Sequence, residues 1–60
     1  MNPWPKRLRA LRRKLGCSQA ALANRLEVHP STVSKWEQGL MVPHRVFQGK
    51  IVELEEGADG

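Results

Sequence analysis

The sequence predicts an all-α fold, a compact bundle of about four helices, and three observations support this prediction. Apolar residues recur three and four positions apart along most of the chain, which is the spacing of one helix face. Proline, serine and glycine stand where such helices would begin and end. The 60 residues, 40% of them apolar and 27% charged, are enough for one small globular domain.

The first helix is predicted from Pro5 to Leu15. Proline is favoured in the first turn of a helix, and glycine, here Gly16, is common just past its end. One face of this helix is apolar and consists of Trp4, Leu8, Leu11 and Leu15. We expect Trp4 to cover this helix as a staple. The other faces are basic, and Arg12 falls at the edge of the apolar face, which puts a charge beside the core.

Two short helices are predicted next, Gln19–Leu26 and Pro30–Gln38. Ser18 is a favourable N-cap for the first, and Pro30 begins the second after a break at residues 27–29. The apolar face of the second consists of Val33, Trp36 and Leu40. Its opposite face is polar and consists of Ser31, Ser34, Lys35 and Gln38, with Thr32 on the flank. Glu37 lies beside the apolar face, as Arg12 does in the first helix, so we expect these two opposite charges to pair.

A last helix is predicted from His44 to about Glu55, because Phe47, Ile51 and Leu54 repeat at helical spacing. Acidic residues gather near its carboxyl end, where the helix dipole favours cations. We therefore expect this end to fray and residues 57–60 to form a disordered tail.

The composition restricts the class of function. Ten lysines and arginines against six acidic residues give a net charge of +4, which favours a polyanionic partner, nucleic acid before a membrane. The single cysteine, Cys17, excludes an internal disulfide and is expected to serve as a small packing residue. No apolar run approaches the ~20 residues of a membrane span. The basic, amphipathic start is also typical of a mitochondrial presequence, but the remaining chain would then be too small to fold.

Candidate catalytic and metal-binding groups do not form a recognisable pattern. We find no catalytic triad, glycine-rich phosphate loop or inward carboxylate pair, so we expect no enzyme activity. His29, His44 and Cys17 lack the paired spacing of a zinc site, and we expect neither a metal nor a cofactor.

Two short helices joined by a brief turn are the helix-turn-helix arrangement. Residues 15–23, LGCSQAALA, and residues 28–39, VHPSTVSKWEQG, resemble the phage repressor and Cro type of helix-turn-helix domain, the XRE family. The resemblance covers about Leu8 to Leu54. It implies a lambda-repressor-like DNA-binding domain in residues 1–56 whose third helix enters the major groove. The carboxyl terminus is truncated relative to members with a fifth helix, which forms their dimer contact.

The resemblance also implies roles for individual residues. The candidate base contacts are Ser31, Thr32 and Lys35, followed by His29 and Ser34. Gln19 matches a position at a phosphate or base edge, and Gln38 and Arg45 match positions that contact the DNA backbone. Arg12 and Glu37 match a partly buried structural ion pair. One departure is Glu27, which stands where the family's turn normally has glycine. A positive φ at Glu27 would cost about 1 kcal/mol of strain.

These observations predict a sequence-specific double-stranded DNA-binding regulator, a repressor or autoregulator that occludes an operator. We expect a homodimer on a palindromic site, formed in solution or only on DNA, and pairing through the Phe47–Leu54 helix by way of Val46 or Val52. We expect no small-molecule ligand and no membrane partner. The expected location is the cytoplasm of a bacterium or phage-infected cell. The alternative is a protein-interaction module, an adaptor or antitoxin-like protein with the same fold, and an RNA-binding or presequence-like function ranks last.

Overall fold

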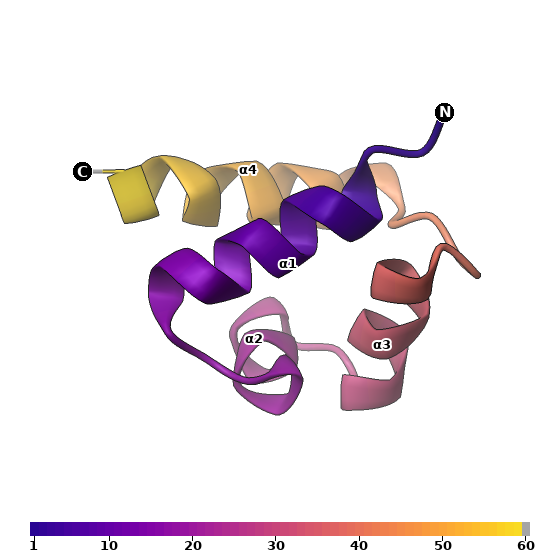
Figure 1. Cartoon of the computed structure of the whole chain (residues 1–60), viewed down its shortest axis with the longest axis horizontal. Helices are drawn as coiled ribbons and strands as arrows, with labels where there is room; N and C mark the ends of the chain where they lie inside the picture. Colours follow the sequence, from indigo (N-terminus) through magenta and orange to yellow (C-terminus); the bar gives the residue numbers. More distant parts are fainter. Residues whose placement is uncertain (60) are drawn as a thin grey trace.

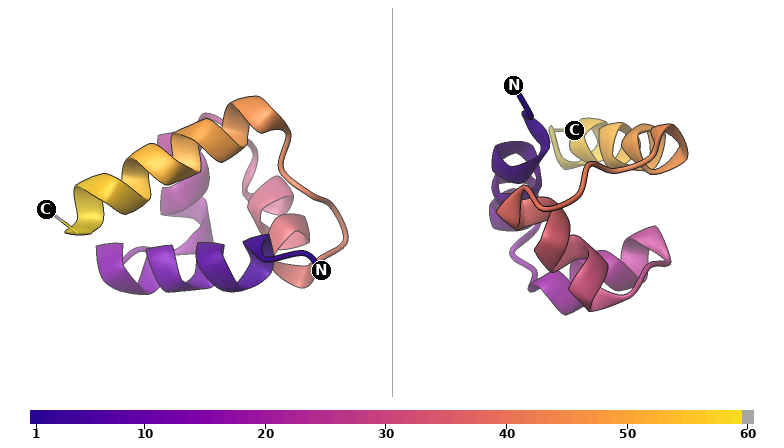
Figure 2. Two further views of the ribbon diagram at one scale, coloured as in Figure 1. Left: turned by 90° about the horizontal axis from the view of Figure 1, so that it is seen from above. Right: turned by 90° about the vertical axis from the view of Figure 1, so that its right-hand side faces the viewer.

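The computed structural model describes residues 1–59, which form four helices and no strand. The helices are α1 (Trp4–Leu15), α2 (Gln19–Leu26), α3 (Pro30–Gln38) and α4 (Arg45–Asp59). Figure 1 shows α1 and α4 side by side in the upper part of the domain, with α2 and α3 packed below them. The right-hand view in Figure 2 shows α2 and α3 as a pair below the other two helices, and the left-hand view, from above, shows them behind α1 and α4. The predicted all-α fold is confirmed.

The core lies where the four helices meet and is made of apolar side chains from all of them. Its members are less than a tenth exposed and are Trp4, Leu8, Leu11, Leu22, Ala23, Leu26, Val33, Trp36 and Ile51. The rings of Trp36 and Phe47 lie 5.6 Å apart, which joins α3 to α4. Burying a leucine-sized side chain contributes roughly 1.5–3 kcal/mol, so α3 is held firmly on its inner face.

The turn between α2 and α3 contains a left-handed residue that is not glycine. Glu27 has φ 59° and ψ 41°, and its N–H donates to the carbonyl oxygen of Asn24 at 3.2 Å. The next N–H, that of Val28, donates to the carbonyl oxygen of Ala23 at 3.0 Å. These two bonds end α2 and turn the chain toward α3. The turn therefore keeps the geometry expected with glycine and carries the strain predicted for Glu27.

Three details differ from the sequence predictions. The first helix begins one residue earlier, because Trp4 enters the core with 8% of its surface exposed. Leu40 is 69% exposed instead of buried on the α3 face, because Gly39 ends α3 in a left-handed conformation and turns the chain outward. The last helix runs from Arg45 to Asp59, so a disordered tail is wrong for residues 57–59, and Gly60 lies outside the described residues.

The longer α4 has a physical explanation in its contacts with the rest of the domain. Leu54 and Ala58 pack against the core and extend the buried face of this helix. Glu55 accepts hydrogen bonds from the guanidinium of Arg7 on α1, one of them from Nε at 3.1 Å. The Arg7 guanidinium also lies over the Trp4 ring, 4.3 Å from its centre. These contacts hold the acidic end of α4 in place against the unfavourable helix dipole.

Candidate nucleic-acid interface

The outer face of α3 is polar and open to solvent. Ser31, Lys35 and Gln38 are exposed, whereas Thr32 and Ser34 are half-buried on its flanks. The inner face of the same helix carries Val33, Trp36 and Glu37, all buried. The helix therefore separates the polar set predicted for DNA contact from the residues that fix it in the domain.

His29 is used at the start of α3 as its N-cap. Its Nδ1 accepts the backbone N–H of Ser31 at 3.1 Å and lies 2.8 Å from the Ser31 hydroxyl oxygen. The N-cap satisfies a backbone donor that the helix leaves without an internal partner. His44 does the same near α4, where Nδ1 accepts the N–H of Val46 at 3.3 Å. Both imidazoles thus have a structural role at a helix start.

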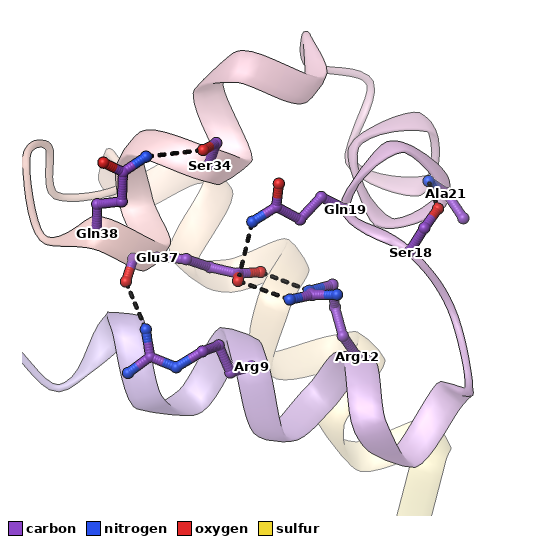
Figure 3. Close-up of polar contacts among 8 residues, drawn as sticks. All are labelled: Arg9, Arg12, Ser18, Gln19, Ala21, Ser34, Glu37 and Gln38. Carbon is purple, nitrogen blue, oxygen red and sulfur yellow. Dashed lines mark hydrogen bonds and ion pairs between the residues drawn. The ribbon is translucent and has the colours of Figure 1, made fainter.

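Glu37 connects three helices and holds α3 in position. Its carboxylate accepts hydrogen bonds from Nε and Nη2 of Arg12 at 2.6 and 2.8 Å, and from Nε2 of Gln19 at 3.1 Å. Its backbone carbonyl accepts a further bond from Nη1 of Arg9 at 2.7 Å. Figure 3 shows this network between α1, α3 and the start of α2. The ion pair predicted between Arg12 and Glu37 is present, and it is bidentate.

The network decides the charge state of the buried carboxyl group, which is only 4% exposed. Burial alone raises the pKa of Glu37. The hydrogen bonds from Arg12 and Gln19, with the charges of Arg12 and Arg9, outweigh burial and hold this pKa below its ordinary value. The hydrogen bonds to Glu37 likewise raise the pKa of Arg12. Glu37 is therefore ionised at neutral pH, and its negative charge is compensated where it lies.

The remaining predicted residues differ in what their side chains do. Gln19 donates one N–H of its amide nitrogen to Glu37, which leaves its second N–H and its carbonyl oxygen for another partner. Gln38 donates from Nε2 to the Ser34 hydroxyl at 2.8 Å, which orders both side chains on the α3 surface. The side chain of Lys35 forms no hydrogen bond or ion pair with any residue from 1 to 58. Arg45 is exposed at the first turn of α4.

Figure 3 shows Arg9, Arg12, Gln19, Ser34 and Gln38 on one side of the domain, with α4 behind them. Arg9 was not among the residues predicted from the sequence. Its position three residues before Arg12 puts both on one helix face, and that spacing could have indicated it. Three of the side chains predicted to contact DNA, Gln19, Ser34 and Gln38, thus lie on the same side of the domain as two arginines of α1.

Comparison with known protein families matches residues 6–58 to a helix-turn-helix domain family. The chain belongs to this helix-turn-helix family. Comparisons with curated proteins and with solved structures give no significant match. Family membership indicates a DNA-binding regulator, and the family is typically not enzymatic. In this helix-turn-helix domain α2 and α3 are the two helices of the motif, which makes α3 the helix that corresponds to the DNA-recognition helix.

Two further structural findings concern other partners. Among the side chains of residues 1–58 of this helix-turn-helix domain, no three of His, Cys, Asp or Glu gather as ligands for a metal ion. None of the helices in that same range is both long enough and apolar enough to cross a bilayer.

Proposed function

We propose that this protein is a sequence-specific regulator of transcription that inserts α3 into the major groove of double-stranded DNA. The observation that carries the proposal is the exposed face of α3, whose hydroxyl groups and lysine point outward from a helix fixed by buried contacts. The net charge of +4 attracts the phosphate backbone, which supplies most of the sequence-independent affinity.

The side chains on this face suit base recognition. Lys35 is free to donate to the O6 and N7 atoms of guanine, a contact worth about 1–3 kcal/mol of discrimination. Ser31 and Thr32 are short and bring the helix close to the base edges, with Ser34 and His29 beside them. In this proposal Gln19, Gln38 and Arg45 contact the sugar-phosphate backbone and fix the orientation of α3.

We further propose repression or autoregulation by occlusion, with an XRE-type homodimer on a palindromic operator whose half-sites lie roughly 34 Å apart. The outer side of α4 supports pairing, because Val46 is 61% exposed and Val52 is 36% exposed. Phe47 and Ile51 face the core and are not available for this contact. Together these two valines expose about as much surface as one fully exposed valine, far less than the ~800 Å² per partner of a standard interface. Pairing is therefore expected to be weak in solution and to be completed on DNA.

A protein-interaction module is the second candidate, and one observation favours it. The segment between α3 and α4 exposes three consecutive apolar side chains, those of Leu40, Met41 and Val42. Exposed apolar patches of this kind mark protein contacts. A complex formed through them would depend little on salt concentration, whereas a DNA complex would weaken steeply.

Selection of bound fragments from random duplex DNA tests the proposal directly. We expect enrichment of one palindromic motif, two chains on each selected duplex, and a steep loss of affinity between ~50 and ~200 mM salt. Equal affinity for selected and scrambled duplexes at every salt concentration would contradict sequence-specific recognition. Salt-independent binding to a protein partner, with no duplex enriched, would favour the second candidate.

A further inference from the structure

A shallow pocket of about 410 Å³ lies where α1 ends and the chain turns toward α2. Three arginines and the two residues after the helix line it: Arg9, Arg12, Arg13, Gly16 and Cys17. The arginines share one surface of α1, because residues three and four positions apart are neighbours on a helix. None of the roles proposed above uses Arg13 or this pocket.

The charges around the pocket are not balanced. Glu37 supplies one carboxylate, which Arg12 binds through Nε and Nη2. Arg9 contributes one N–H to the Glu37 carbonyl oxygen, a neutral acceptor. The side chain of Arg13 is exposed and forms no hydrogen bond or ion pair with residues 1–58. Three guanidinium groups against one carboxylate leave a surplus of positive charge, together with N–H donors that these bonds do not use.

The backbone of the pocket indicates which groups would hold a ligand. The N–H of Gly16 donates to the Arg13 carbonyl oxygen at 3.3 Å, and the N–H of Cys17 donates to the Arg12 carbonyl oxygen at 3.1 Å. These amides are occupied in ending α1, so the guanidinium groups must supply the donors. Gly16 adds no side chain, and a Cβ built there would meet no atom within 4 Å. The floor of the pocket is therefore open to an anion.

The pocket also lies next to the proposed DNA surface. Cys17 is followed directly by Ser18 and Gln19, the N-cap and first residue of α2. Figure 3 places Arg9 and Arg12 on the same side of the domain as Ser34 and Gln38 of α3. In helix-turn-helix complexes the first helix of the motif crosses the DNA backbone while the second lies in the groove. A phosphate of that backbone would then pass beside the start of α2.

We propose that this pocket, through Arg13 with Arg9 and Arg12, binds a backbone phosphate of the duplex beside the groove that α3 occupies. The inference rests on the proposed DNA-binding function and adds a site on α1 to it. The contact is independent of base sequence, and Arg13 contributes a positioning charge without contacting bases.

Titration of a fluorescein-labelled mixed-sequence duplex with the full chain tests this site. Arg13→Ala is expected to weaken binding about tenfold near 100 mM salt and to reduce the slope of log K against log salt by about 0.9, the value of one phosphate contact. Arg13→Lys is expected to keep most of the slope because it keeps the charge. The matched control is Arg25→Ala, which removes the same charge from the other end of α2, beside a different pocket.

Equal affinity and slope for Arg13→Ala and Arg25→Ala would overturn the site while leaving the DNA-binding proposal intact. Failure of the unmodified chain to bind the duplex at low salt would overturn both. A parallel melting experiment with inorganic phosphate, against chloride at equal ionic strength, is expected to show no stabilisation that depends on Arg13. Stabilisation lost in Arg13→Ala would show that a free phosphate is the ligand, and would contradict the assignment to DNA.

Discussion

Removing the carboxylate that joins three helices is the most informative perturbation of the fold. In Glu37→Ala, the Arg12 guanidinium, whose side chain is 25% exposed, loses its ion pair, and the Gln19 amide loses its acceptor. Breaking a buried pair costs about 3–5 kcal/mol. Because Arg12 retains some solvent contact, the lower value applies, and we expect a loss of about 3 kcal/mol. A core of this size rarely supplies more than about 3–5 kcal/mol, so the variant should be close to unfolding at room temperature.

The assay is urea unfolding followed by circular dichroism, supported by thermal melting. A loss of about 3 kcal/mol corresponds to a fall of roughly 12–24 °C in melting temperature for a domain of this size. Glu55→Ala is the matched control, because it breaks an ion pair with Arg7 whose side chains are 38% and 24% exposed, and it should cost less than about 1 kcal/mol. Replacing Arg12 and Glu37 together by apolar residues should recover part of the loss. If Glu37→Ala and Glu55→Ala lower stability by the same small amount, the central role given to this network is wrong.

The lowered pKa of Glu37 predicts that its contribution to stability is present above the ordinary glutamate pKa and is lost as pH falls through the lowered value. Urea midpoints measured between about pH 6 and about pH 3 should therefore decline more steeply in the unmodified protein than in Glu37→Gln. Urea midpoints that decline equally with pH in the two proteins would contradict this expectation. Glu27→Gly should raise the free energy of unfolding by about 1 kcal/mol, because glycine adopts φ 59° without strain. The ion pair with Lys50 that this variant loses is exposed and therefore contributes little. A urea midpoint lower than that of the unmodified protein would show that the turn is unstrained. Lys35→Ala should lose about 1–3 kcal/mol of binding to a selected duplex and little on random DNA, measured by fluorescence anisotropy. Equal losses of affinity for the selected duplex and for random DNA would show that Lys35 contacts a phosphate and no base.

Most of the fold could be predicted because its determinants are local. The bounds of α2 and α3 follow from Ser18, Pro30 and the residues that end each helix, and all of these act within one turn. The pair of Arg12 and Glu37 could also be predicted. Each charge stands at the edge of an apolar face, and a charge beside the core is stable only when an opposite charge pairs with it.

The features that could not be predicted depend on tertiary contacts. The extension of α4 beyond Glu55 depends on Ala58 packing against the core, a tertiary contact that no local pattern contains. The exposure of Leu40 depends on the direction in which the chain leaves α3, although its spacing places it on the apolar face. The use of the Gln19 amide on Glu37 depends on how α2 packs against α3. In each case the sequence identifies the side chain and the packing determines its partner.

Mapping of amide chemical shifts on ¹⁵N-labelled protein during titration with a selected duplex tests the central claim most directly. The claim is that the exposed face of α3 lies against the bases. It predicts the largest shifts between Ser31 and Gln38 and at Gln19, with small changes at Arg25 and Lys50, which line a separate pocket. A spectrum unchanged by any duplex, or shifts confined to the outer side of α4, would contradict the claim.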